Sequence, residues 1–187
     1  MRKILDPKSL FFPEPVCIVA TYDSKGVANA MNAAWGGISD TNEIHLCLSC
    51  EHKTVKNLLK KKCFTVSCGT EDTYIACDYV GMISGNDVND KLKKCNFHTE
   101  KASKINAPII KELPFALECK LISYEPNTGH TYAKIVAVSV DSKVLTKDKI
   151  DIKKLKPIIF DGENHTYHAI GRKVGYAFKD FKKIANK

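Results

Sequence analysis

The sequence has almost no arginine. Of its 29 basic residues only Arg2 and Arg172 are arginines, although basic residues outnumber the 21 acidic ones and give a net charge of +8. Proteins that read bases or clamp nucleic-acid phosphates depend on the planar, forked guanidinium group. A lysine excess spread along the chain is typical of a solvated surface. We therefore expect no nucleic-acid partner, whereas a small anionic ligand fits the charge.

Long apolar runs and linkers are also absent. No run approaches the ~18 residues of a membrane span, and Asp6, Pro7 and Pro13 interrupt the N-terminus before a signal-peptide core. Eight cysteines without an export signal indicate a reducing compartment. We expect a cytoplasmic protein without membrane association, and a single domain over residues 1–187, because no repeat or Ser/Gly linker divides the chain.

Several catalytic motifs are missing. The sequence contains no GxGxxG, GxxxxGK[ST], GxSxG or HExxH, which argues against a Rossmann dinucleotide site, a nucleoside triphosphate loop, a hydrolase elbow and a zinc protease. One CxxC pair, Cys47 and Cys50, lies in a run that alternates like a strand from residue 43 to 50. Residues three apart on a strand face opposite sides, so we expect neither a dithiol nor a metal site.

Short strand-like runs joined by turn sequences dominate the chain. They span 16–22, 27–35, 43–50, 64–68, 115–124, 130–141 and 158–160. Helical patterns are limited to 54–62, to short pieces between 70 and 114, and to a terminal helix. Hairpin connections between most strands predict a mainly β protein, an antiparallel barrel with peripheral helices.

Segment 29–37 reads NAMNAAWGG and contains the only tryptophan, Trp35. Small residues let a flat ligand approach the backbone, and the tryptophan ring can stack on or wall off an aromatic ring. The alternative is a crowded barrel strand with a core tryptophan.

Segment 49–57 passes from a strand into a helix near Thr54. A helix start offers unpaired N–H groups and a positive dipole end, and Lys53 and Thr54 add a charge and a hydroxyl, which together suit a phosphate. The alternative is that Thr54 only caps the helix.

Segment 81–91 contains Ser84 and Gly85, which permit close backbone approach, and Lys91 follows one or two helical turns later. His130 begins a strand after a turn. Asp87 as a plain helix cap and His130 as a structural residue are the alternatives here.

Taken together, these segments resemble the flavin reductase-like, FMN-binding split-barrel family, and within it the flavoredoxin branch. The resemblance runs from residue 13 to Phe178. It is carried by NAMNAAWGG, by HKT at 52–54, by SGNDVNDK at 84–91, by the segment 108–120 and by TGH at 128–130.

The resemblance implies a Greek-key split β-barrel that forms a homodimer, with one FMN per subunit near the interface. The isoalloxazine ring would lie along Asn32, Ala33, Ala34 and Trp35. The phosphate would be held at Ser49, Cys50, His52, Lys53 and Thr54. Further cofactor-binding positions are Asn29, Ser84, Gly85, Lys91 and Phe160. Many relatives carry an arginine near His52, and this chain does not.

The implied activity is an NAD(P)H-dependent, flavin reductase-like FMN oxidoreductase. Lys91 is the candidate for charge stabilisation at the ring or phosphate, and His130 for lining the approach of the donor or acceptor. Two alternatives remain: a non-enzymatic FMN electron carrier that docks with a ferredoxin-like protein, and a cofactor-free basic β-barrel binding module.

Overall fold

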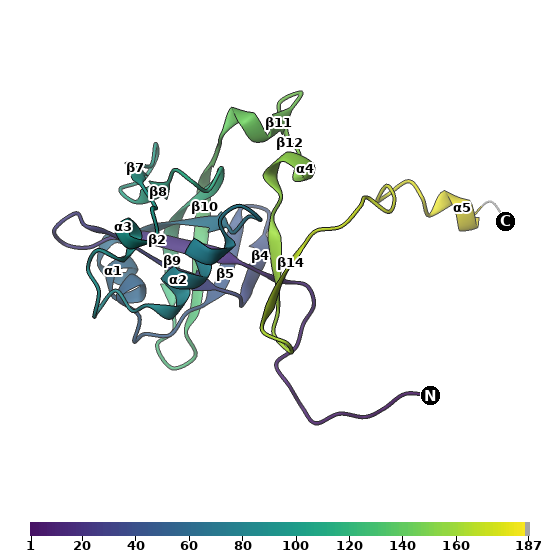
Figure 1. Cartoon of the computed structure of the whole chain (residues 1–187), viewed down its shortest axis with the longest axis horizontal. Coiled ribbons are helices and arrows are strands. Elements are labelled where there is room, and N and C mark those ends of the chain that lie inside the picture. Colours follow the sequence, from purple (N-terminus) through teal and green to yellow (C-terminus); the bar gives the residue numbers. More distant parts are fainter. Residues whose placement is uncertain (186–187) are drawn as a thin grey trace.

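The computed structural model describes residues 1–185. Seven strands form one curled antiparallel sheet in the order β3-β2-β6-β9-β10-β5-β4 (Figure 1). Their bounds are Cys17–Tyr22 (β2), Ala28–Ala33 (β3), Gly36–Asp40 (β4), Glu43–Cys47 (β5), Cys63–Cys68 (β6), Phe115–Tyr124 (β9) and His130–Val140 (β10). Because β10 returns to pair with β5 rather than continuing outward, the sheet is a Greek-key split barrel, as the sequence predicts.

Smaller strands and short helices surround this sheet. Glu14–Pro15 (β1), Ile158–Asp161 (β13) and Thr166–Ala169 (β14) form a second sheet in the order β1-β13-β14, and two ribbons join Thr99–Lys101 (β7) to Pro108–Ile110 (β8) and Leu145–Thr146 (β11) to Lys149–Ile150 (β12). The helices are Lys53–Lys61 (α1), Tyr74–Met82 (α2), Lys91–Lys94 (α3), Ile152–Leu155 (α4) and Lys182–Ala185 (α5), with a 3₁₀ turn at Ser142–Val144 (η1). Within residues 1–185 none of these helices is long and apolar enough to cross a bilayer.

Two predicted strands have different bounds in the structure. The strand expected at 27–35 ends at Ala33, and a separate strand β4 begins at Gly36. A Cβ on Gly36 would lie 2.6 Å from the His45 carbonyl oxygen, so glycine lets β4 pack against β5. The strand expected at 43–50 ends at Cys47, because the chain turns where His52 N–H donates to the Ser49 carbonyl.

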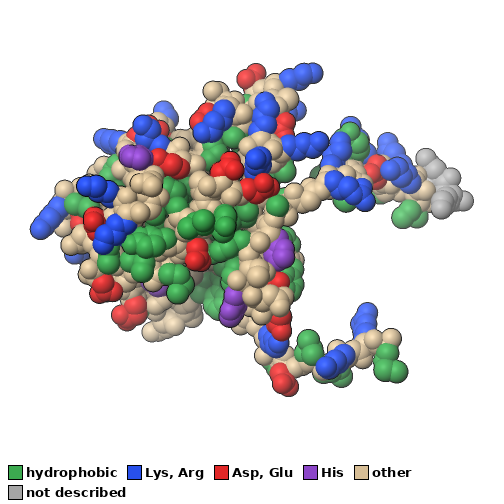
Figure 2. Space-filling view, viewed as in Figure 1, with side chains coloured by type: hydrophobic (Ala, Val, Ile, Leu, Met, Phe, Trp, Pro, Cys, Tyr) green, Lys and Arg blue, Asp and Glu red, His purple; other side chains and the backbone are tan. Residues whose placement is uncertain are grey.

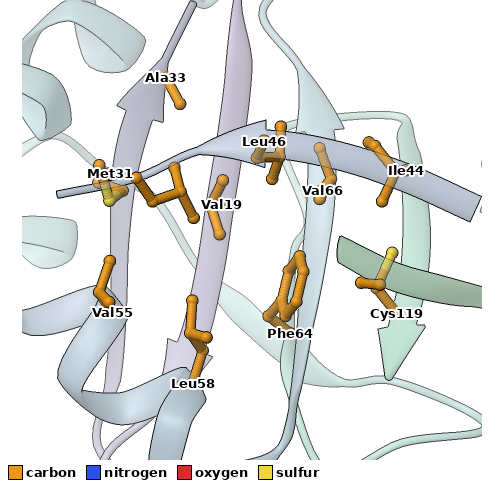
Figure 3. Packing of buried hydrophobic residues seen from close by; sticks show 12 residues of the cluster. Val19, Met31, Ala33, Ile44, Leu46, Val55, Leu58, Phe64, Val66 and Cys119 are labelled. Carbon is orange, nitrogen blue, oxygen red and sulfur yellow. The ribbon is translucent and has the colours of Figure 1, made fainter. Parts of the chain in front are cut away.

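The main core fills the inside of the half-barrel, and α1 closes one end of it (Figure 3). Phe64 and Val19 lie at its centre, and Val55 and Leu58 project from α1 into the same layer. All four side chains are at least 99% buried. This packing fixes the start of α1 against the start of β3.

A second core lies on the opposite face of β2 and β3. Ile18 and Ala30 point into it, together with Cys77 and Val80 of α2 and Ile158 of β13. Strand β3 is therefore covered on both faces, whereas its outer edge has no strand partner among residues 1–185. Every second residue along such an edge directs its amide and carbonyl away from the sheet.

Candidate functional site

The start of α1 lies directly beside the start of β3. His52 occupies the N-cap position, and its side chain makes no bond to the helix. Thr54 is 1% exposed, and its hydroxyl oxygen accepts from the Asn29 amide at 2.7 Å. The alternative in which Thr54 caps the helix is therefore wrong. Because that oxygen is the acceptor, the Thr54 O–H proton is free to donate to a ligand.

The loop between α2 and α3 closes over this point. A Cβ on Gly85 would lie 2.1 Å from Asn29 Oδ1 and 3.1 Å from a Lys53 side-chain carbon, so only glycine fits there. Lys53 Nζ donates to Asn89 Oδ1 at 3.1 Å, which ties the loop to α1. We call Asn29, Lys53, Thr54 and Gly85 the helix-start cluster. All four are residues that the sequence predicts to bind a ligand.

The electrostatics around the helix-start cluster favour an anion. The first turn of α1 has no acidic residue, and its N-terminus carries the positive end of the helix dipole. Partial burial, together with the ammonium groups of Lys91 and Lys56, lowers the pKa of His52 below its ordinary value. The His52 ring is therefore neutral near pH 7, and the positive charge comes from the lysines.

Lys91 is buried, at 3% exposure. Its Nζ donates to the carbonyls of Val80 at 3.0 Å and Ile83 at 2.8 Å, where α2 ends. Burial in the first place, and then the nearby charge of Lys53, lower the pKa of Lys91 to about 8. These bonds hold the beginning of the loop that carries Ser84 and Gly85, and one of the three N–H protons remains for a ligand.

The turn before α1 carries three more predicted residues. Ser49, Cys50 and His52 are all exposed, and the Ser49 hydroxyl accepts from the Glu51 amide at 3.4 Å. In the opposing loop, the Ser84 hydroxyl accepts from the Asn86 amide at 3.1 Å. Both serines therefore shape the turns that flank the helix-start cluster.

The small-residue strand β3 presents its predicted residues in different directions. Ala33 points into the main core beside Met31 (Figure 3), so only its backbone is available to a ligand. Asn32 points to the other face, where its amide donates to the Cys77 carbonyl and to the Tyr167 hydroxyl, both at 3.4 Å.

The segment from Asn32 to Trp35 borders three cavities that share lining residues. One of about 170 Å³ is lined by Val16, Asn32, Ala34, Phe160 and Tyr167. Trp35, which is 53% exposed, lines two more, of about 430 and 280 Å³. Phe160 borders the smaller of these two, so the structure places Asn32, Ala34, Trp35 and Phe160 along adjoining cavities.

Sequence analysis missed Tyr167 and Asp78. The Tyr167 hydroxyl donates to Asp78 Oδ1 at 2.9 Å, and burial, followed by this bond and the charge of Asp78, raises the pKa of Tyr167. On strand β14 only Tyr167 is half-buried, and the residues on both sides of it are exposed, so the short sequence TYHA carries no local pattern that singles it out.

His130 lies away from the helix-start cluster, on the outer face of β10. It is exposed, and its backbone lies opposite that of Cys47 on the neighbouring strand β5. The Cys47 amide in turn donates to the Trp35 carbonyl at 2.8 Å. Two strand spacings place the His130 backbone about 10 Å from that of Trp35. The His45 ring makes an edge contact with His130 at 5.1 Å between centroids.

The CxxC pair makes no disulfide, and all eight cysteines are free. Because β5 ends at Cys47, the expectation that both thiols sit on one strand is wrong. The two instead have separate partners: the Cys47 thiol donates to the Thr128 carbonyl and the Cys50 thiol to the Glu51 carboxylate. Residues 1–185 contain no group of three His, Cys, Asp or Glu side chains that could hold a metal ion.

Comparisons with known proteins agree with this geometry. The family model described as flavin reductase like domain matches residues 9–165. Among solved structures, flavoredoxin of Desulfovibrio vulgaris (Miyazaki F) is 31% identical with a TM-score of 0.91, covering 96% of this chain and 98% of that chain. Flavoredoxin from Methanosarcina acetivorans is 26% identical with a TM-score of 0.89, covering 98% and 100%. A comparison with curated protein sequences finds no match.

Proposed function

Because the chain belongs to the flavin reductase-like family, and within it to the flavoredoxin branch, we propose that it binds one FMN per subunit and carries electrons or hydride through it. When bound, FMN supplies hydride or one-electron transfer at its isoalloxazine ring. The protein's part is to hold the phosphate and the ring at the two ends of one strand.

One observation carries this proposal. The edge strand β3 begins at the helix-start cluster and leads to the cavities lined by Ala34, Trp35 and Phe160. The extended chain from Asn29 to Trp35 spans about 20 Å. An anion site at one end and an aromatic-walled cavity at the other suit a molecule with one terminal phosphate and a flat ring.

We assign the contacts as follows. Lys53, the Thr54 hydroxyl and the turn through Ser49, Cys50 and His52 hold the phosphate. Free backbone groups along the edge from Asn32 to Trp35 bind the rim of the ring. Lys91 and Ser84 act by holding the loop in which Gly85 leaves room for the ligand. Without a nearby arginine, the phosphate contacts are the weaker point contacts of lysine, hydroxyl and amide groups.

Titration with riboflavin, FMN and FAD tests this proposal. We expect FMN to bind at least about tenfold more tightly than riboflavin, a difference of roughly 1.4 kcal/mol, and FAD not to be preferred. Equal affinity for riboflavin and FMN would show that no phosphate site exists. Failure of all three to bind would leave the cofactor-free binding module.

For the reaction we propose NAD(P)H-dependent reduction of the flavin, with His130 lining the approach of the donor or acceptor. The lysine excess supports a second candidate, an electron carrier that receives its electrons from an acidic, ferredoxin-like protein. Mixing the yellow protein with NADH and NADPH separates the two. Loss of the oxidised flavin absorbance with either nucleotide supports the reductase, and no change supports the carrier.

We also propose that the protein is a homodimer and works in the cytoplasm. The C-terminal segment 171–185 extends away from the barrel, with lysines and apolar side chains side by side (Figures 1 and 2). Val174, Phe178 and Ile184 are each at least 80% exposed. Within residues 1–185, the hydrogen bonds of this segment are internal to it, such as that from Lys173 to the Tyr176 hydroxyl. A second copy of the chain would cover these side chains, and the eight free thiols fit a reducing compartment.

A further inference from the structure

Two carboxylates are buried in this protein, and their surroundings differ. Glu118 is fully buried, and its oxygens accept four bonds, from Ser139, Lys104 and twice from Ser103. Glu14, on β1, is 5% exposed. Among residues 1–185 no side chain or backbone group forms a hydrogen bond or ion pair with the Glu14 carboxylate. Among the residues described, His45 Nε2 is the one fully enclosed side-chain nitrogen or oxygen without a partner, so the Glu14 oxygens border accessible space that a cationic partner can reach.

Glu14 lies where two cavities meet. It lines both the cavity of about 430 Å³ and the cavity of about 280 Å³ beside Trp35. Its carboxylate sits against Gly162, where a Cβ would come within 3.2 Å of Glu14 Oε1. Glu14 is therefore the one acidic residue that lines both cavities, whereas Glu163 lines only the smaller one.

The rest of the lining is largely apolar. The larger cavity is walled by Leu10, Phe11, Pro13 and Pro15 in addition to Trp35. Lys8 also lines both cavities, but its ammonium group pairs with Glu163 on the β13–β14 hairpin. Lys8 is therefore already engaged by Glu163, and within residues 1–185 the Glu14 carboxylate makes no ion pair.

We propose that this cavity binds a compact aromatic or alicyclic molecule that carries a protonated amine or amidine. The cationic group donates to Glu14 and the ring packs against Trp35, whose face also attracts cations. Binding itself does not depend on a flavin. The position of the ligand beside the flavin ring does rest on the proposed function, because Ala34 and Trp35, which follow the end of β3, are assigned to that ring.

The experiment compares three ring compounds of the same size on the protein as purified: benzylammonium, benzyl alcohol and benzoate. Calorimetry measures their dissociation constants, and the emission of Trp35, the only tryptophan, reports whether the ligand occupies this cavity. We expect benzylammonium to bind about tenfold more tightly than benzyl alcohol, to change the Trp35 emission, and benzoate not to bind. This ranking needs no substitution, so it does not depend on the folding of a variant.

Two variants assign the preference to one carboxylate. Glu14→Gln should bring benzylammonium down to the affinity of benzyl alcohol. Glu125→Gln, the control at an exposed turn outside both cavities, should leave the ranking unchanged. Equal affinity for benzylammonium and benzoate, or an unchanged preference in Glu14→Gln, overturns the proposal. So does the absence of binding by all three compounds, the result expected if a second copy of the chain fills the cavity.

The outcomes separate this inference from the flavin proposal. If the protein is colourless and still binds benzylammonium through Glu14, the proposed amine site is supported and the proposed FMN binding is contradicted. If the protein is yellow and binds none of the three compounds, the proposed FMN binding is supported and the proposed amine site is contradicted. In the yellow protein, a shift of the flavin absorbance on adding benzylammonium supports the placement beside the ring.

Discussion

Among the buried threonines, Thr54 and Thr65 use their hydroxyl groups in opposite ways. Thr65 donates to the Pro108 carbonyl at 2.6 Å, whereas Thr54 accepts from Asn29 and keeps its proton. A Thr54→Val substitution removes a donor to the ligand and leaves the Asn29 amide without an acceptor. We expect FMN affinity to fall about tenfold and stability by about 1 kcal/mol, measured by flavin titration and urea unfolding.

Thr65→Val is the control for this substitution. It should destabilise the fold to a similar extent while FMN affinity stays unchanged. If the two variants lose stability equally and neither loses affinity, Thr54 has only a structural role.

Glu118 determines part of the acid stability. Burial alone would raise its pKa, but bonds from Ser139, Lys104 and Ser103 together outweigh burial and hold the pKa below its ordinary value. A depressed pKa adds stability above the unfolded-state pKa, and this contribution is lost as the pH falls through the folded pKa. We expect Glu118→Gln to cost about 1–3 kcal/mol at pH 7 and less at pH 4, measured by urea unfolding. Glu125→Gln, at an exposed turn, should change neither value, and an equal cost at both pH values would contradict the argument.

At the scale of elements, the loop between α2 and α3 decides whether the helix-start cluster is accessible. Gly85→Ala places a Cβ 2.1 Å from Asn29 Oδ1, so the loop or the Asn29 amide must shift. We expect FMN affinity to fall at least about tenfold, by flavin titration. Gly37→Ala is the matched control, because its Cβ meets nothing within 4 Å. Unchanged affinity in Gly85→Ala would separate this loop from the ligand.

The end of β5 gives a prediction for the cysteines. The Cys47 and Cys50 thiols have separate partners across the end of the strand, so we expect Cys47→Ser and Cys50→Ser to retain flavin reduction within about twofold. Steady-state reduction assays measure this. A collapse of activity in both variants, with a reversible disulfide seen by mass spectrometry, would contradict it.

Strand patterns and turn signals predicted most of the barrel, because alternation between 16 and 22 or between 115 and 124 is a local property of the chain. These patterns predicted the wrong strand ends where a tertiary contact determines where a strand begins or ends. Gly36 begins a new strand because β5 leaves room only for glycine. The turn at Ser49 ends β5 although the alternation continues to Cys50.

Some residues of the candidate site could be predicted from the local sequence, and others could not. Lys53, Thr54 and Gly85 lie in segments whose composition carried a signal, and the fold brings them together. Glu14 and Tyr167 are single residues on the small second sheet. Their importance comes from what they face across the fold, and a local sequence pattern does not contain that information.

At the scale of the whole molecule, the exposed C-terminal segment is the surface on which the proposed homodimer can be tested. Phe178 and Phe181 are 95% and 62% exposed, and burying such side chains contributes about 1.5–3 kcal/mol each. We expect Phe178→Ser/Phe181→Ser, and removal of residues 171–187, to raise the dimer dissociation constant at least about tenfold, measured by light scattering over a concentration series. Lys182→Ser/Lys183→Ser is the control on the same segment. A dimer that withstands both apolar changes would exclude this segment from the interface.

The small second sheet also has a consequence for the order of folding. Strands β3 and β4 stand at opposite edges of the main sheet, yet only Ala34 and Trp35 separate them, so bringing these edges together costs little loop entropy. Pairing β1 with β13 instead joins Glu14 to Phe160, and most of the sequence lies between these two residues. We expect the β3–β4 connection that carries Trp35 to form early and the wall that carries Phe160 and Tyr167 to dock last. The same wall would then be the first part to open in local unfolding, which gives a ligand a way in and out without disturbing the barrel.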